Sequence, residues 1–226
     1  MIVSIHQPNY IPWLPFFNKI KRSDIFVILD DVKYTKNDWR NRNKIRSGNT
    51  SKFLTIPIRK IFTKEKIKNV QLPEDNLWKK KHLNSISYNY SKSSFYKSHI
   101  SFFEEYYNSN IDTLSEFNNI FLKYCVKLFN LKTKIIQSSS LEIDSSIKST
   151  DRLIEIITKV GGKKYYSGIG SKNYLDEKKM SESNIELIFQ DFKFKNYVDS
   201  KTTFIPGLSV IDLMNNVDVN NLNEFI

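Results

Sequence analysis

The sequence predicts an α/β fold with a mostly parallel sheet and a helical insertion. Residues 2–5 have the composition of a short buried strand, and residues 24–29 form a second strand whose apolar run is unbroken. Such an unbroken run is typical of a strand that is buried on both faces of a parallel sheet. A strand, a loop, a helix and a second strand within about thirty residues match the outline of a βαβ unit.

The segment between these two strands predicts a loop and then a helix. Three prolines between residues 8 and 15 each remove a backbone donor and disfavour a helix. Over residues 13–21 the spacing of Phe16, Phe17 and Ile20 is helical. A short helix therefore returns the chain to the second strand.

The middle of the chain adds strands and then a helical region. Residues 53–58 predict a strand that contains a proline and so lies near a sheet edge, and residues 67–70 are expected to extend the sheet. Helical spacing then dominates to about residue 130. We expect a single domain over residues 1–226 with a helical insertion at about 76–130, made of helices at 76–90, 94–107 and 113–128.

The α/β pattern returns in the last part of the chain. Strands are predicted at 134–137, 165–167 and 185–189, and a helix that opens near residue 149 should end at Gly161-Gly162. A last helix contains residues 210–214. Strands that alternate with helices favour a Rossmann-like sheet.

The formal net charge of +11 allows two interpretations. A nucleic-acid-binding protein gathers its basic residues into a patch or stripe, whereas here the lysines are spread along the chain. We therefore expect no nucleic-acid partner and attribute the charge to a lysine-rich composition. The charge would also help to attract an anionic substrate such as a nucleotide or a phosphopantetheine group.

Other features of the composition concern the cellular compartment. The single cysteine, Cys125, can form no intrachain disulfide, and its helical, apolar surroundings predict a buried side chain. No signal peptide is visible, and no segment approaches the roughly 18 apolar residues of a membrane span. These features predict a cytoplasmic protein without a membrane span.

Several motifs together resemble the WbqC-like protein family. Residues 6–13, His-Gln-Pro-Asn-Tyr-Ile-Pro-Trp, followed by Phe16-Phe17 and residues 24–31, are similar to the opening signature of that family. The similar pieces that follow, over essentially the whole chain, are Trp39 with Asn41-Arg42-Asn43, residues 55–58, Trp78 with Lys81-His82, residues 166–168 with Tyr174-Leu175, and residues 208–213.

The sequence departs from the family pattern in three places. Pro15 stands where the family usually has glycine, Val198-Asp199 stands where a glutamine is expected, and residues 214–216 replace a more apolar ending. The last two departures weaken the transfer of residue roles to the C-terminal third of the chain. They leave the N-terminal resemblance intact.

The resemblance implies a transferase of bacterial surface-polysaccharide biosynthesis, because the family occurs in gene clusters for O-antigen lipopolysaccharide and other surface glycans. A glycyl- or acyl-transferring role on amino sugars has been proposed for its members. The expected substrate is then a nucleotide-linked amino sugar. The expected donor is a thioester of coenzyme A or of an acyl carrier protein, and no bound cofactor is expected.

Acyl transfer to a sugar amine needs a general base and an oxyanion donor. His6 is the best candidate for the base, because an unperturbed histidine titrates near neutrality and His6 follows the first strand; the alternative is a structural histidine that holds the loop. Asp30 and Asp31 follow the second strand, where they could orient His6, bind an ammonium group or hold a metal. The ligand set is too small for zinc, so no metal is expected.

Other segments suggest substrate contacts, each with a structural alternative. Arg42 and its neighbours could grip phosphates or form a solvated basic loop. Trp78 and His82 share a helical face, which also suits an interfacial helix, whereas His99 is expected at the surface. The expected substrate-binding residues are Gln7, Asn9, Tyr10, Trp13, Asn41, Arg42, Asn43, Lys81, His82, Ser167, Gly168 and Tyr174.

The loop that starts at Ser167-Gly168 could cradle an anion, although it lacks the glycine spacing of a dinucleotide-binding fingerprint. Two other functions remain open. The order of elements also resembles the start of a nucleotidyltransferase domain, which would adenylate with ATP and magnesium; Lys172 and Lys178-Lys179 are weak candidates for the basic signature that it needs. A non-catalytic scaffold for glycan assembly would instead show an exposed apolar patch.

Overall fold

Five parallel strands form the sheet that the sequence predicts. In the computed structural model, which describes residues 1–226, the sheet has the order β5-β2-β1-β6-β7, and every neighbouring pair is parallel. The α/β class with a mostly parallel sheet is therefore confirmed. The strands are β1 (Ile2–His6), β2 (Ile25–Ile28), β5 (Lys134–Gln137), β6 (Lys164–Ser167) and β7 (Glu186–Phe189).

Two compact units divide the chain. The first consists of Met1–Pro8, Pro15–Val32 and Leu131–Lys193, and it contains the parallel sheet. The second consists of Asn9–Leu14, Lys33–Asn130 and Phe194–Ile226. No helix of the structure combines the length and the apolar character that crossing a membrane requires.

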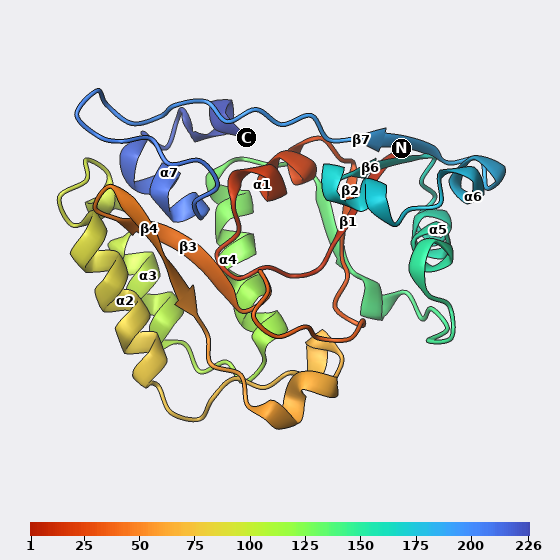
Figure 1. Cartoon of the computed structure of the whole chain (residues 1–226), viewed down its shortest axis with the longest axis horizontal. Helices are drawn as coiled ribbons and strands as arrows, with labels where there is room; N and C mark the ends of the chain where they lie inside the picture. The colour runs from red at the N-terminus through yellow and green to blue at the C-terminus, as the bar shows by residue number, and fades with distance from the viewer. The chain divides into compact units, whose positions relative to one another are not determined.

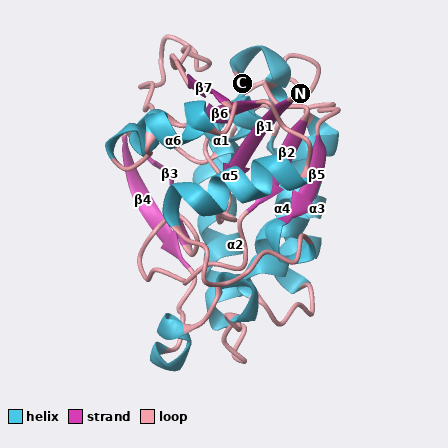
Figure 2. Cartoon of the chain, turned by 90° about the vertical axis from the view of Figure 1, so that its right-hand side faces the viewer, coloured by secondary structure: helices cyan, strands magenta, loops and turns pink.

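In the first unit, helices cover both faces of the sheet. Helix α5 (Ser149–Lys159) lies across one face, as Figure 2 shows, and buries Ile156 and Ile157 against Val3. Gly162 permits this close approach, because a Cβ there would lie 2.6 Å from the Val3 side chain and 2.7 Å from that of Ile157. The predicted helix end is found at Gly161, whose φ of +76° is typical of a residue that follows a helix.

On the face opposite α5, α1 (Leu14–Lys21) packs its Phe16 ring against Phe26 of β2, with centroids 5.2 Å apart.

The short helix α6 (Glu177–Glu182) completes the connection from β6 to β7. Its Met180 is buried in the same core cluster as Ile156 and Ile157 of α5.

The second unit combines a hairpin with helices (Figure 1). Strands β3 (Arg42–Ser47) and β4 (Thr50–Thr55) are antiparallel and form a two-stranded sheet of their own, with Gly48 at φ +59° in the turn. The helices are α2 (Leu77–Tyr90), α3 (Ile100–Asn108), α4 (Leu114–Leu128) and α7 (Val210–Asn216).

Three of these helices occupy the region of the predicted insertion. Their core is aromatic: Tyr106 of α3 stacks on Phe117 of α4 with centroids 4.1 Å apart, and Cys125 is fully buried as expected. His99, in contrast, was expected at the surface and is only 2% exposed. Its Nδ1 lies 2.9 Å from the Tyr124 hydroxyl, because His99 precedes α3 and faces α4.

The expected extension of the sheet at residues 67–70 is wrong. The segment Ile67–Asn69 is a 3₁₀ helix, and Val70 follows it as the C-cap. Ile67 and Val70 are both fully buried, while the residues between them are exposed. Apolar residues three apart lie on one side of a 3₁₀ helix. A strand would have placed them on opposite faces.

Candidate functional site

Polar side chains gather at the edge of the parallel sheet where the strands end. β1 ends at His6, which pairs in register with Ile28 of β2, and the Leu29 N–H donates to the His6 carbonyl at 2.8 Å. Asp30 therefore follows β2 at the same edge as His6.

The strand order reverses at β1, because β2 and β5 lie on one side of it and β6 and β7 on the other. Ligands of open α/β sheets bind outside the carboxyl ends of the strands at such a switch point. Here the switch point has His6 at the end of β1 and Ser167 at the end of β6.

The contacts of His6 determine which nitrogen of its ring carries the proton. Its Nδ1 lies 2.8 Å from the Gln7 carbonyl oxygen, and a carbonyl can only accept, so Nδ1 is the donor. The neutral ring therefore keeps its lone pair on Nε2. Phe16 contacts the ring edge-on, with centroids 5.0 Å apart, and holds its orientation. A general base could use this nitrogen to take a proton.

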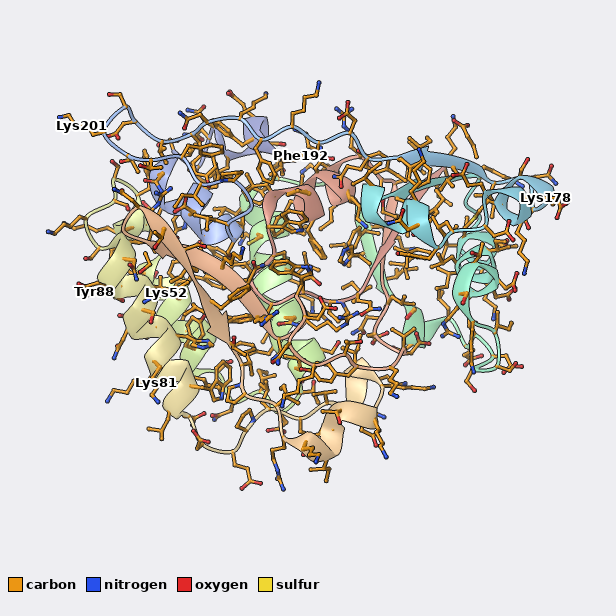
Figure 3. All side chains as sticks on the ribbon, viewed as in Figure 1. Lys52, Lys81, Tyr88, Lys178, Phe192 and Lys201 are labelled. Carbon is orange, nitrogen blue, oxygen red and sulfur yellow. The ribbon has the colours of Figure 1, made fainter.

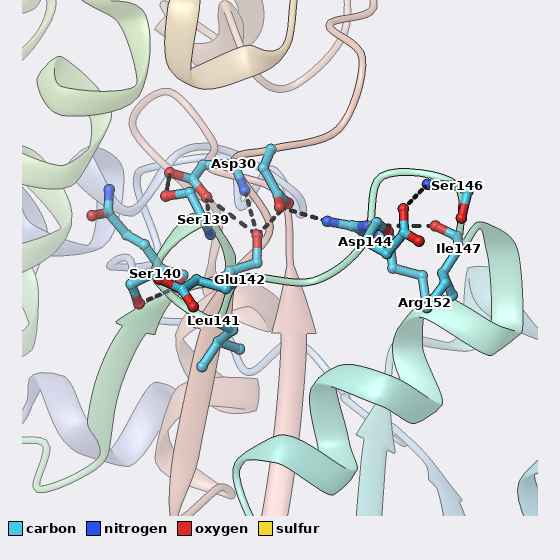
Figure 4. Close-up of polar contacts among 12 residues, drawn as sticks. Asp30, Ser139, Ser140, Leu141, Glu142, Asp144, Ser146, Ile147 and Arg152 are labelled. Atoms are coloured by element: carbon cyan, nitrogen blue, oxygen red, sulfur yellow. Dashed lines mark hydrogen bonds and ion pairs between the residues drawn. The ribbon is translucent and has the colours of Figure 1, made fainter.

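The Asp30 carboxylate is held by the serines that follow β5 (Figure 4). It is 1% exposed and accepts from the Ser139 backbone N–H at 3.0 Å and from the Ser139 hydroxyl at 2.8 Å. The Ser138 hydroxyl lies 3.2 Å from Asp30 Oδ1. The ends of β2 and β5 are thereby linked at the carboxyl edge.

Asp31 forms a second buried contact at this edge. It accepts from the Ser138 hydroxyl at 2.6 Å and pairs with Arg152 of α5, whose side chain is 8% exposed. Arg152 also donates to the Asp144 carbonyl at 3.2 Å. The serine run and Arg152 were not singled out from the sequence, although a polar run directly after a strand of a parallel sheet signals this edge.

Lys19 is a further residue that the sequence analysis missed. It is 4% exposed, and its Nζ donates to the Ile5 carbonyl at 3.2 Å. Burial lowers the pKa of this ammonium group to about 7. The available signal was spacing, since Lys19 lies three residues after Phe16 and one before Ile20, on the apolar face of α1.

We expect Lys19→Met to stabilise the protein in a pH-dependent way. The folded-state pKa of about 7 lies below the ordinary value of 10.5, so protonation favours unfolding. The wild type loses stability as the pH falls from about 10.5 to about 7, and the loss is complete below that. Such a shift corresponds to roughly 5 kcal/mol, from which the lost hydrogen bond subtracts about 1–2 kcal/mol.

Urea unfolding at pH 6 and at pH 9.5 measures this effect. The gain should be about 3 kcal/mol at pH 6 and much smaller at pH 9.5. Lys123→Met, at an exposed position of α4, is the control and should change little at either pH. An equal gain for Lys19→Met at both pH values would show that the ammonium group carries no burial penalty.

The expected substrate-binding residues of the second unit include a buried network. The Tyr10 hydroxyl lies 2.8 Å from Nδ1 of His82 and 2.5 Å from the Tyr107 hydroxyl. Burial lowers the pKa of His82 to about 4, so its ring is neutral at neutral pH. Trp78 contacts His82 edge-on at 5.4 Å, which is consistent with a shared helical face.

Tyr107 also lines a hollow of about 530 Å³ beside α2, together with Lys79 and Lys80. Lys81 does not line it; this residue is exposed on α2 (Figure 3). Of the three residues of the buried network, Tyr107 lines the hollow, whereas Tyr10 and His82 do not.

Asn41 and Asn43 are both buried and hold neighbouring loops. Asn41 donates to the Ile56 carbonyl at 2.8 Å. Asn43 donates to the carbonyls of Tyr10 at 3.2 Å and Ile11 at 2.9 Å. Ile11 has φ +38°, a conformation that costs a β-branched residue energy. Asn43 therefore holds a strained part of the loop that contains the family signature, residues 6–13.

The remaining expected residues differ in exposure. Asn9 is 4% exposed and its Nδ2 has no hydrogen-bond partner, whereas Gln7, Trp13 and Arg42 are half-buried. In the loop after β6, the Ser167 hydroxyl lies 2.7 Å from that of Ser171. Around Gly168 there is open space, and Tyr174 is 71% exposed.

No group of three or more histidine, cysteine, aspartate or glutamate side chains is arranged to hold a metal ion. The groups that this edge of the sheet presents are His6 at the end of β1 and the loop after β6, with open space at Gly168.

Comparison with known proteins identifies the family. The model of the WbqC-like protein family matches residues 7–224. Uncharacterized protein Rv1507c of Mycobacterium tuberculosis (strain ATCC 25618 / H37Rv) is 30% identical over 218 residues, which cover 95% of this chain and 93% of that protein. No solved structure matches the chain. The chain belongs to the WbqC-like protein family.

Proposed function

We propose that this protein is an acyltransferase of bacterial surface-polysaccharide (O-antigen) biosynthesis. It transfers an acyl or aminoacyl group, such as glycyl, from a thioester to the amino group of a nucleotide-linked amino sugar. The observation that carries the proposal is His6, which stands at the switch point of the sheet with Nδ1 held by the Gln7 carbonyl. Family membership supports it.

The chemistry needs one base that returns its proton. The amine attacks the thioester carbonyl and forms the C–N bond, and His6 Nε2 takes the proton that the nitrogen loses. The C–S bond then breaks, and the same proton passes to the leaving thiolate. Amide and thiol are the products, no oxidant or reductant is consumed, and a base placed in this way supplies about 10²–10⁴-fold in rate.

The buried network at the ends of β2 and β5 has a supporting part in this proposal. Asp30 is held by Ser139 and Asp31 by Arg152, so the carboxylates stabilise the edge that carries His6. Both carboxylates already accept hydrogen bonds from donors at this edge. The proposal therefore assigns the proton to His6 rather than to an aspartate.

Nucleotidyl transfer is the second candidate, and the strand order favours it. Nucleotides bind across the switch point of doubly wound sheets, and this sheet has such a point at β1. Of the expected cations, however, Lys178 pairs with Glu182 and Lys179 with Asp151. Only Lys172 remains for a triphosphate.

Two assays separate the candidates. The protein is incubated with UDP-linked amino sugars and with acetyl- or glycyl-thioesters of coenzyme A and of an acyl carrier protein, and products are identified by mass spectrometry. Amide formation without ATP is expected. Exchange of pyrophosphate into ATP, without amide formation, would replace acyl transfer by adenylation, and inactivity in both assays would favour a scaffold.

A further inference from the structure

An exposed aromatic surface with two cations lies in the second unit. We call it the Trp39 platform and define it as Trp13, Trp39, Phe53, Arg42 and Lys44. Trp13 and Trp39 are nearly parallel, at 7° with centroids 6.2 Å apart, and Trp39 continues to Phe53 at 6.3 Å. Trp39 is 39% and Phe53 42% exposed, so two large rings face solvent side by side.

The two cations of the platform, Arg42 and Lys44, lie over the Phe53 ring. Arg42 Cζ is 4.5 Å from the centroid of Phe53, and Lys44 Nζ is 5.4 Å from it. Lys44 pairs in register with Phe53, and residues two apart on a strand share a face. Arg42, Lys44 and Phe53 therefore lie on one face of the hairpin.

Neither cation of the platform pairs with an acidic side chain. The nearest acidic residue in sequence, Asp38, pairs with Arg40. Arg46, the next residue on this face of β3, pairs with Asp212. Two neighbouring cations without counter-charges repel each other, and an anion that binds between them relieves this repulsion.

The platform is held in place before any ligand arrives. The backbone N–H of Trp39 donates to the Asp38 carboxylate at 2.6 Å. The backbone carbonyl of Trp39 accepts from the Tyr10 backbone N–H at 2.9 Å. Phe194 contacts Trp13 on its other side at 6.1 Å. A ligand that stacks here would lose little energy to ordering the rings.

We propose that the Trp39 platform binds a nucleoside diphosphate, with the base stacked on Trp39 and the phosphates bound by Arg42 and Lys44, which lie over the neighbouring Phe53 ring. A sugar alone would need the rings but no cations, and inorganic phosphate would need the cations but no rings. Both features together match a nucleotide. This inference rests on the proposed function, whose substrate contains a nucleoside diphosphate.

Calorimetric titration of the full chain tests it, with UDP, uridine and pyrophosphate as probes. Trp39→Ala should weaken UDP binding by roughly 5–150-fold, the range for loss of one base-stacking ring. Arg42→Ala should weaken UDP and pyrophosphate and leave uridine nearly unchanged. Lys52→Ala is the matched control, because Lys52 pairs with Ile45 on the opposite face of the hairpin.

Two outcomes would overturn the inference: UDP, dTDP, GDP and ADP all fail to bind, or Trp39→Ala and Arg42→Ala bind UDP as well as Lys52→Ala does. Thermal melts of each variant exclude unfolding as the cause. Failure of the proposed function is distinguishable, because binding is measured without turnover. UDP binding without amide formation would refute acyl transfer alone, and amide formation with an unchanged KM in both variants would refute the platform alone.

Discussion

His6→Ala is expected to lower the turnover of amide formation by about 10²–10⁴-fold while the protein stays folded. The Nδ1 contact with the Gln7 carbonyl leaves the lone pair on Nε2, and alanine removes the only group proposed to accept the amine proton. Because proton transfer belongs to the chemical step, kcat should fall more than KM rises. Steady-state kinetics with the sugar nucleotide and a thioester measure both constants.

The His6→Gln variant distinguishes two roles of His6, that of a catalytic base and that of a residue that only holds the loop in place. Glutamine can still donate a hydrogen bond to the Gln7 carbonyl but cannot take a proton, so a catalytic base would not be rescued. If His6 only ties the loop down, glutamine should largely restore activity and alanine should lower the melting temperature. Nearly full activity of His6→Gln with an unchanged pH profile would remove His6 from the mechanism.

The parallel sheet was predictable because its strands are encoded locally. Residues 25–28 are all apolar and all buried, and that pattern needs no knowledge of the partner strands. Strand β3 was not predicted, because its residues indicate a basic loop and its buried positions include Asn43, which is fully buried although polar. The side-chain NH₂ group of Asn43 donates to the carbonyls of Tyr10 and Ile11. A local sequence pattern does not reveal such distant partners.

The candidate site, too, could be predicted only in part from the sequence. His6 and Asp30 could be placed at one edge because a single βαβ unit contains both. The partners of Asp30 could not be assigned, because Ser138 and Ser139 lie 108 and 109 residues further along the chain. They meet Asp30 only because β5 pairs with β2. Lys19 was missed for another reason, since burial of an ammonium group opposes the usual preference of lysine for solvent.

A buried ion pair joins the C-terminal segment of the second unit to the hairpin. The Asp212 carboxylate is fully buried, and Arg46 donates to it through Nε at 2.8 Å and Nη2 at 3.0 Å. Tyr197 donates to the same carboxylate at 2.9 Å, and burial, reinforced by the Asp212 charge, raises the pKa of Tyr197. Arg46 also donates to the Thr203 carbonyl at 2.7 Å.

Arg46→Met is expected to destabilise the protein by about 3–5 kcal/mol, because it leaves the Asp212 carboxylate buried without its counter-charge. Urea unfolding at pH 7 measures the loss. The double variant Arg46→Met/Asp212→Leu removes both charges and should recover most of that stability, since apolar replacements of a buried pair are often neutral or stabilising. Its remaining deficit would come from the Tyr197 hydroxyl and the Thr203 carbonyl, which lose their partners. If the double variant is less stable than Arg46→Met alone, the charge of Asp212 is not the source of the loss, and packing of the Arg46 side chain is.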